Sequence, residues 1–366
     1  MKLVFICGTF EPGRDGVGDY TRRLAAELIK QGNKIGVIAL NDKFIADETK
    51  YTDSVENIDI PVLRLSVKQP MDVRLLQAQQ WIDIFNPDWL SLQFVPFSFD
   101  EKGLIFGLAN KLVKLAAGRR WHIMFHETWV GMESGASVKM KLWGFLQKKL
   151  TGNLIKNLKP LSIHTHTSLY KSELQKFGVK VKILPLFGNL PIRNAKTKSK
   201  RTDNTLKFLI FGGIHYGAPI AQFADKVSIL NETLQYNIQF LFVGNNGSEL
   251  KLWSTTLMEK GFAIHISGFL PEAEITSAFL DADIGITTTP ELLVEKSGTV
   301  AAMNEYGLPV VCVARDWNVK GFASNSLLTK SLENSLTLAL KNERILKTEE
   351  LSERAQIFIK EIESYG

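Results

Sequence analysis

Short apolar runs alternate with amphipathic stretches along most of this chain, and this alternation constrains the fold more than any other feature. The runs have the length of strands, and the stretches between them repeat their apolar residues at helical spacing. Such alternation is typical of a mostly parallel sheet with helices on both faces. The first half predicts strands over 2–7, 34–40, 62–65, 89–93, 121–125, 161–165 and 181–184, and helices over 18–31, 73–85, 104–117 and 137–150.

A polar segment, RNAKTKSKRTDN at 193–204, interrupts this pattern and is typical of an exposed linker. The alternation then restarts, with strands predicted over 206–211, 238–243, 263–266, 284–287 and 310–313, helices over 220–234, 248–260, 272–280 and 300–306, and two more helices within 331–365. A chain of 366 residues has the length of two such domains.

We therefore predict an α/β chain of two doubly wound, Rossmann-like domains. The first domain covers residues 1–190, the linker 191–204 and the second domain 205–341. In open α/β sheets, ligands lie beyond the carboxyl ends of the strands. We expect the ligand site in a cleft where the two domains face each other.

Composition bounds the setting in which this chain works. Its two cysteines, Cys7 and Cys312, lie within apolar runs, which indicates a reducing compartment without a disulfide framework. The apolar run at 3–6 is too short for a signal peptide, and no run approaches the roughly 20 residues of a membrane span. The basic residues behind the net charge of +6 are dispersed, so no nucleic acid is expected as a partner. We predict a cytoplasmic protein.

A glycine-rich segment with Gly8, Gly13, Gly16 and Gly18 follows the first predicted strand. It leads into a helix whose start we place near Asp19, a good N-cap residue. Glycines at 16 and 18 would let the backbone approach a ligand, and the free N–H groups of a helix start suit a phosphate. The spacing is not that of the dinucleotide-binding fingerprint. A purely structural turn is the alternative.

The segment GVGDYTRRLAAEL at 16–28, followed by GNKIGV at 32–37, resembles the opening of retaining GT-B glycosyltransferases of family four, which use nucleotide sugars. The resemblance implies that Gly16 and Gly18 lie against the donor's diphosphate and the acceptor. It also makes Arg14 and Asp15 candidates on the acceptor side. It implies the GT-B fold, with a last helix within 342–366 that returns to the first domain.

A histidine and a glutamate follow the strand predicted at 121–125. There, His126 could donate a hydrogen bond to a sugar hydroxyl or a phosphate, and Glu127 could accept one. A buried polar pair is the alternative, but the resembled family often carries a histidine here, near the transferred sugar. His164 and His166 show an H-x-H pattern, but no third ligand is evident, and we expect no metal.

The region 137–159 is basic and amphipathic, with lysines interleaved with Met140, Leu142, Trp143 and Phe145. Such a helix can lie in a membrane interface, with its lysines toward anionic head groups. Many enzymes of the resembled fold build on lipid-linked acceptors, so we expect peripheral contact with the inner face of the membrane. An ordinary core-facing helix with a solvated lysine face is the alternative.

The second half departs from the resembled family after Gly213. The family usually carries an arginine and a lysine there that neutralise the donor's diphosphate. This chain has His215, which could supply one hydrogen bond to the donor but cannot match the charge of such a pair. Later segments keep the family's order. The resemblance places Gly268, Phe269 and Leu270 beside the nucleotide base, where backbone groups make the contacts.

The densest signal lies at 289–302, TPELLVEKSGTVAA. Glu295 fits the first glutamate of the family's donor motif, but Met303 stands at the position of the second. The segment resembles a variant, K-S-G-T, in which Lys296 and the hydroxyls of its neighbours face the phosphates. A polar loop that opens a helix is a ready anion site, formed here by the N–H groups of Ser297, Gly298 and Thr299. A well-capped structural helix is the alternative.

These features predict a retaining glycosyltransferase that moves a sugar from a nucleotide-diphosphate sugar to a saccharide or lipid-linked acceptor, in polysaccharide or glycoconjugate synthesis. Loop N–H groups and Lys296 would stabilise the leaving diphosphate, and Glu295 and His126 would hold the sugar. No cofactor besides the donor and no metal are expected. The alternatives are a catalytically weak GT-B-fold sugar-binding or assembly partner, and a nucleotide-sugar epimerase of the same fold.

Overall fold

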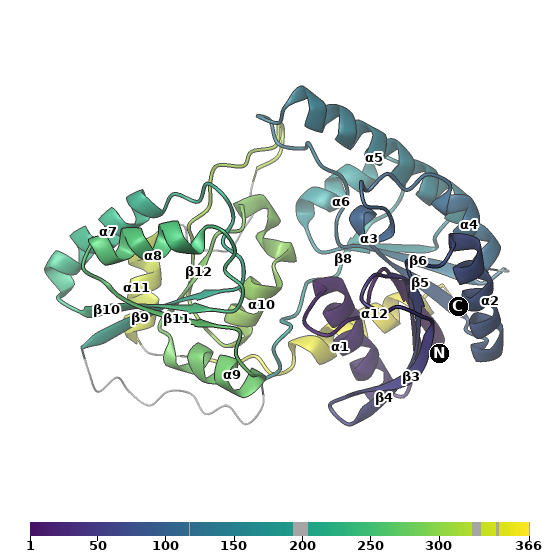
Figure 1. The fold of residues 1–366 in the computed structure, drawn as a ribbon, viewed down its shortest axis with the longest axis horizontal. Coiled ribbons are helices and arrows are strands. Elements are labelled where there is room, and N and C mark those ends of the chain that lie inside the picture. The colour runs from purple at the N-terminus through teal and green to yellow at the C-terminus, as the bar shows by residue number, and fades with distance from the viewer. Residues whose placement is uncertain (117, 193–203, 324–330, 342–343, 366) are drawn as a thin grey trace. The chain divides into compact units, whose positions relative to one another are not determined.

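The computed structural model describes residues 1–116, 118–192, 204–323, 331–341 and 344–365. They form two compact units, drawn in Figure 1. Unit 1 comprises Met1–Pro185 and Leu351–Gly366, and unit 2 comprises Leu186–Glu350. Within these described ranges, no helix is both long enough and apolar enough to cross a bilayer.

Unit 1 is built on an eight-stranded sheet of order β3-β4-β2-β1-β5-β6-β7-β8. The strands are β1 (Lys2–Cys7), β2 (Lys34–Asp42), β3 (Thr49–Val55), β4 (Ile58–Ser66), β5 (Trp89–Phe94), β6 (Arg120–Phe125), β7 (Ser162–Thr165) and β8 (Lys182–Ile183). All neighbours are parallel except β3 and β4. Strand order reverses at β1, so the switch point lies between β1 and β5.

The antiparallel strand β3 was not predicted from the sequence. The side chains of β3 are alternately half-buried and exposed, so its sequence has no continuous apolar run. It pairs with β4 through a tight hairpin in which Val55 faces Ile58. Glu56 and Asn57 form the turn with positive φ angles of 52° and 64°, as the favoured two-residue hairpin turn requires.

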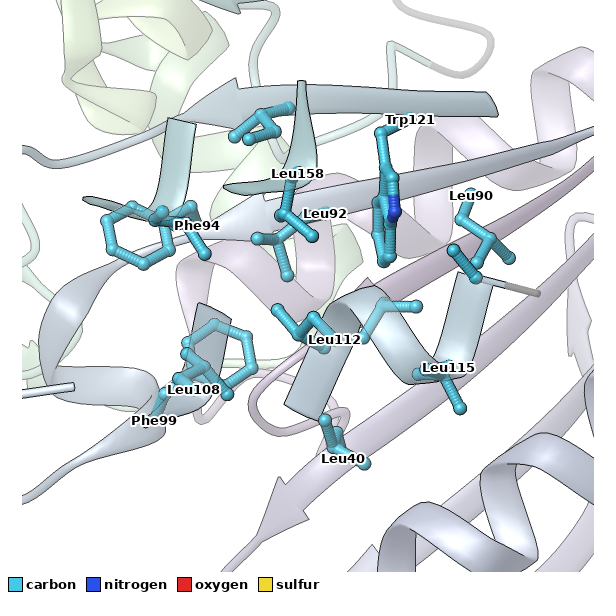
Figure 2. Close-up of a cluster of buried hydrophobic side chains, with 14 of the residues drawn as sticks. Leu40, Leu90, Leu92, Phe94, Phe99, Leu108, Leu112, Leu115, Trp121 and Leu158 are labelled. Atoms are coloured by element: carbon cyan, nitrogen blue, oxygen red, sulfur yellow. The ribbon is translucent and has the colours of Figure 1, made fainter. Parts of the chain in front are cut away.

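The two faces of the unit 1 sheet differ in chemistry. One face is apolar and is covered by α2 (Met71–Phe85), α4 (Leu108–Ala116) and α5 (Val138–Leu158). Figure 2 shows side chains of β5 and β6, such as Leu92 and Trp121, directed toward leucines of α4. The opposite face is covered by α1 (Gly16–Lys30) and α12 (Glu350–Glu363), where the rings of Phe5 and Phe358 lie 6.0 Å apart. Unit 1 also contains α3 (Pro96–Phe99) and α6 (Ser168–Gln175).

Unit 2 contains a five-stranded parallel sheet of order β11-β10-β9-β12-β13. Its strands are β9 (Thr205–Phe211), β10 (Asn237–Val243), β11 (Ala263–Gly268), β12 (Ile284–Thr287) and β13 (Val310–Cys312). One face packs on α7 (Ile220–Leu234), α8 (Leu250–Glu259) and α11 (Leu332–Lys341). The other packs on α9 (Glu272–Asp281) and α10 (Gly298–Glu305). The order places the switch point between β9 and β12.

The unit boundaries differ from those predicted at 190 and 342. Unit 2 begins at Leu186 because Gly188 N donates to Glu305 Oε1 at 2.6 Å and Leu190 is buried in a unit 2 core with Tyr306. The chain rejoins unit 1 at Leu351, one residue into α12. Most of the predicted linker, 193–203, lies outside the described residues.

Candidate functional site

The first glycine-rich segment is capped differently from the prediction. Helix α1 begins at Gly16, and its N-cap is Asp15 rather than Asp19. One carboxylate oxygen of Asp15 accepts from Val17 N at 3.1 Å, and the other accepts from the Thr9 hydroxyl at 2.6 Å. Asp19, one turn into the helix, accepts from Gly13 N at 3.0 Å. The carboxylate of Asp15, proposed on the acceptor side, is therefore engaged in holding the helix start.

The two candidate glycines of this segment lie in the first turn of α1 rather than in a loop. At Gly18 a Cβ would lie 3.1 Å from Thr9 O, so the absence of a side chain allows helix and loop to pack closely. A Cβ at Gly16 would meet nothing within 4 Å, and the Arg14 side chain is exposed. Of these two glycines, Gly16 leaves open space above the helix start, where a ligand could approach.

An ion network that sequence reasoning missed fixes the loop after β1. Arg64 Nε lies 2.7 Å from Asp42 Oδ2, and its Nη2 lies 2.7 Å from Glu11 Oε2. Asp42 also accepts from Phe10 N at 3.2 Å. Burial opposes the charge of Arg64, but the hydrogen bonds to both carboxylates raise its pKa above the ordinary value. The loop is thereby held to β2 and β4, strands that are distant in sequence.

His126 lies directly after β6 and is 7% exposed. Its Nε2 lies 2.9 Å from Gln93 Oε1, and its Nδ1 lies 3.0 Å from His166 Nε2. The ring of Tyr20, from α1, stands edge-on to both imidazoles, at 4.8 and 5.3 Å between ring centres. The structure therefore joins His126 to the glycine-rich helix and to the H-x-H motif. Glu127, the next residue, is half-buried.

In unit 2, the backbone turns sharply at the switch point between β9 and β12. Gly212 has a φ of +79°, and a Cβ there would lie 3.1 Å from Thr299 Cγ2, so the turn after β9 closely approaches the start of α10. Gly213 is exposed. His215 N donates to Thr288 Oγ1 at 2.8 Å across this point, and His215 Nδ1 lies 3.2 Å from the same hydroxyl.

The K-S-G-T segment forms the start of α10. Ser297 is the N-cap and accepts from Val300 N at 3.4 Å, and its hydroxyl lies 3.0 Å from that of Thr299. Gly298 is the first helical residue. Lys296 ends the preceding 3-10 helix, Glu291–Lys296. The N–H groups of the first turn and two hydroxyls thus stand at the positive end of a helix dipole, as an anion site requires.

Two cations act on the imidazole of His215. Partial burial lowers its pKa, and the positive charges of Lys296 and Arg315 lower it further. Arg315 follows β13, and its Cδ would lie 3.5 Å from a Cβ at Gly217. The sequence analysis did not single out Arg315, because it stands about a hundred residues after Gly213 with no motif around it. In the fold it supplies an arginine near the position where the resembled family carries one.

The remaining donor-side candidates lie at other places on unit 2. Glu295 is exposed on the 3-10 helix. Met303, at the position of the family's second glutamate, is fully buried against Gly285 in the core. At the end of β11, Gly268 has a φ of +63°, and Phe269 is 77% exposed. Leu270 is partly buried. The structure thus clusters His215 with Lys296 and its neighbours, whereas residues 268–270 follow a strand two places away from β9.

A cavity of about 340 Å³ in unit 2 lies elsewhere. It is lined by Asp283, Pro309 and Arg344, at the amino ends of β12 and β13 and therefore opposite the candidate site. Arg344 there donates to the carbonyls of Phe279 and Leu280 at the end of α9. Over the described ranges, no group of three or more His, Cys, Asp or Glu side chains is placed to hold a metal ion.

No known protein-family model and no curated protein sequence matches this chain. Solved structures do match. The catalytic domain of starch synthase IV from Arabidopsis thaliana, bound to ADP and acarbose, has a TM-score of 0.59 at 11% identity, with coverage of 100% of this chain and 99% of that one. Anabaena Alr3699/HepE, in complex with UDP and glucose, has a TM-score of 0.54 at 16% identity, with coverage of 98% and 94%.

A third similar structure is a Listeria monocytogenes protein with the provisional name UDP-N-acetylglucosamine 2-epimerase. Its TM-score is 0.57 at 11% identity, with coverage of 100% of this chain and 96% of that one. At such identities the likeness concerns the fold alone. Together with the two mainly parallel sheets, it confirms the predicted α/β architecture: the chain has the two-domain, Rossmann-like GT-B fold.

Proposed function

We propose that this protein is a retaining glycosyltransferase that uses a nucleotide-diphosphate sugar. The observation that carries the proposal is the start of α10, where Lys296 directly precedes the N-cap, the N–H groups of Gly298 and Thr299 lie in the first turn, and the charges of Lys296 and Arg315 both act on His215. A leaving diphosphate carries several negative charges, and fixed donors and cations stabilise it as it departs. ADP and UDP in two structures of the same fold support a nucleotide as the ligand.

We assign the remaining roles on the same basis. Glu295 and His126 would hold hydroxyls of the transferred sugar, and the chain around 268–270 would pass beside the base, with Phe269 offering an exposed ring. Gly16, at the open start of α1, would lie near the ligand. The acceptor would be a saccharide or a lipid-linked sugar in polysaccharide or glycoconjugate synthesis at the cytoplasmic face of the membrane. Retention of configuration rests on the sequence resemblance. The reaction would need no cofactor.

The first experiment incubates the protein with UDP-, GDP- and dTDP-sugars, with and without a chelator. We expect one nucleotide to raise the melting temperature, because a ligand that binds only the folded state stabilises it. The matching sugar donor should be hydrolysed slowly, with an α-configured sugar as the first product when the donor is α-linked. No response to any nucleotide would contradict the proposal and favour a sugar-binding or assembly role. An inverted product would contradict retention alone.

An epimerase is the second candidate, because a structure named for this activity matches the whole chain. The same donor panel separates the two activities. Proton NMR of the sugar after incubation without acceptor would show a C2 epimer, with deuterium incorporated from D2O, for an epimerase. We expect neither for this protein.

We also propose that the first half of α5 contacts an anionic membrane. Val138, Leu142 and Phe145 are 84%, 61% and 54% exposed. They face outward because Gly144 and Gln147 fill the buried side of this half, where a Cβ on Gly144 would collide with the Val130 carbonyl. Lys139, Lys141 and Lys149 are close to them along the helix, whereas Lys148 forms an ion pair with Glu173. An apolar surface with basic neighbours is complementary to anionic head groups above acyl chains.

Replacing Leu142 and Phe145 together by serine is expected to weaken binding to phosphatidylglycerol-containing vesicles by about tenfold or more, because two apolar side chains no longer enter the interface. Co-sedimentation measures the bound fraction. The control replaces Leu252 and Met258 of α8, which are 53% and 55% exposed, by serine and should leave binding unchanged. Equal binding by both double variants, or no binding by the wild-type protein, would contradict membrane contact through α5.

A further inference from the structure

The sheet face of unit 1 beneath α1 and α12 carries a file of buried polar side chains. Parallel strands that are covered on both faces are normally apolar on both. The opposite face of these strands is indeed apolar (Figure 2). The file consists of six polar side chains from β5, β6, β7 and the residues that follow them, each at most 7% exposed: Ser91, Gln93, His122, His126, His164 and His166. Such a network is costly unless it is satisfied, which makes each member's hydrogen bonds informative.

The six side chains form one continuous hydrogen-bonded file. At its inner end, His164 Nδ1 lies 3.0 Å from His122 Nε2, and His122 Nδ1 lies 2.7 Å from Ser91 Oγ. Gln93 Nε2 then donates to Ser91 Oγ at 2.8 Å. At the carboxyl end of the strands the file continues from Gln93 to His126 and His166, and His166 Nδ1 lies 2.9 Å from the carbonyl of Leu184.

The partners at the carboxyl end fix the number of ring protons there. The Leu184 carbonyl only accepts, so His166 Nδ1 must donate. Gln93 Oε1 also only accepts, so His126 Nε2 must donate. The bond between His126 Nδ1 and His166 Nε2 needs one more proton. Three ring protons on two imidazoles amount to one positive charge, whereas a neutral pair holds two.

The inner end of the file is neutral. Burial lowers the pKa of His122 well below its ordinary value, with a further contribution from His164. Burial also lowers the pKa of His164 to about 4. Each therefore carries one ring proton at neutral pH. The Ser91 hydroxyl accepts from Gln93 and can still donate its own proton to His122 Nδ1, in which case His122 Nε2 donates to His164 Nδ1. His164 Nε2 is then an N–H group with no hydrogen-bond partner among the described residues.

The direction of the Gln93 carboxamide decides between two arrangements of the file. With Nε2 toward Ser91, as in the structure, the pair of His126 and His166 carries an extra proton. With the carboxamide reversed, Gln93 Nε2 donates to His126 Nε2, His166 Nδ1 still donates to the Leu184 carbonyl, and the pair needs only two ring protons and is neutral. Titratable groups around the file include Tyr20 from α1, whose ring contacts His126, and Glu361 and Lys182, whose charges act on His164; Glu127 follows His126 in the chain.

We propose that Gln93 is a positioning residue for His126, and that its side-chain oxygen holds an extra proton on the pair formed by His126 and His166. This inference rests on the proposed function in one respect: it makes the pair a source of positive charge and of an oriented N–H group for a hydroxyl of the transferred sugar. Gln93 itself is fully buried and acts only through His126.

The test counts ring protons by NMR of protein labelled with 15N-histidine at pH 7.5, with the signals of the pair assigned from His126→Gln and His166→Gln variants. We expect three ring N–H groups on the pair in the wild-type protein and in Gln93→Glu, which still offers an acceptor. Gln93→Met, of similar length but unable to accept, should show two. A His265→Gln variant, whose histidine is exposed on β11, is the control and should show the wild-type count.

Activity supplies the second readout. Gln93→Met should lower kcat about 10- to 100-fold with nearly unchanged UDP affinity, and Gln93→Glu should restore most of it. Two protons in the wild-type pair, or a Gln93→Met variant that loses activity with its proton count unchanged, would overturn the proposal. If no nucleotide sugar is turned over, the proposed function fails, and the wild-type proton count still decides this inference. If Gln93→Met does not fold, the number of ring N–H groups on the wild-type pair still decides between the two arrangements.

Discussion

Replacing Lys296 by alanine is expected to weaken UDP binding roughly 10- to 100-fold, the largest effect on ligand binding that we predict. A hydrogen bond to a charged group contributes about 1.5–3 kcal/mol, and each 1.4 kcal/mol is tenfold in affinity. Lys296 directly precedes Ser297, the N-cap of α10. Its charge and that of Arg315 both act on His215 near the switch point. Titration calorimetry with UDP measures the change.

The control for this variant is Lys251→Ala, which removes an exposed lysine from α8 and should bind UDP as the wild-type protein does. Undiminished affinity in Lys296→Ala would show that the K-S-G-T segment does not carry the diphosphate site. Arg315→Ala should weaken binding to a similar degree, since both cations act on the same imidazole. The double variant tests whether they share one anion, because residues with a common partner are not additive.

A titration of His215 checks the placement of Lys296 without any ligand. The charge of Lys296 lowers the pKa of His215, because a neighbouring cation disfavours the protonated imidazole. Removing that charge should therefore raise the pKa of His215 toward its ordinary value, and NMR across the pH range would follow it. An unchanged pKa would place Lys296 away from His215, whatever the binding result.

Replacing Phe358 by alanine is expected to lower the free energy of unfolding of unit 1 by about 3–5 kcal/mol, the largest stability effect that we predict. Phe358 is 1% exposed and joins α12 to the sheet. Its ring lies 6.0 Å from that of Phe5 and 5.1 Å from that of His122. Truncation would leave a cavity beside the buried histidines, and their rings would gain no new contacts in place of those lost with the phenyl ring.

Urea denaturation followed by tryptophan fluorescence measures this change, with the transition of unit 1 analysed separately because two units need not unfold together. The neighbouring Ile357 is 42% exposed, and Ile357→Ala should change the free energy by no more than about 0.5 kcal/mol. A small loss in Phe358→Ala, comparable to that of the control, would mean that α12 contributes little to the stability of unit 1.

The strands illustrate what a local pattern can predict. The runs at 2–7, 238–243 and 284–287 became β1, β10 and β12 with at most one residue of difference, because buried parallel strands need continuous apolar runs bounded by turns. Strand β3 escaped prediction because an exposed edge strand buries little and therefore carries no such run. Helix α1 began three residues before the expected Asp19 because two aspartates four residues apart both suit an N-cap.

The sequence by itself determined the two-domain α/β architecture and indicated which segments end at the carboxyl edges of the sheets, since periodicity and turn residues act over a few residues. Only the tertiary structure placed Arg315 near His215 and joined Gln93 to His126 and His166. These contacts connect segments that follow different strands of one sheet and are separated in sequence by whole crossover helices. Which side chains meet there depends on strand order and register, and both are set by the packing of the complete sheet rather than by any one segment.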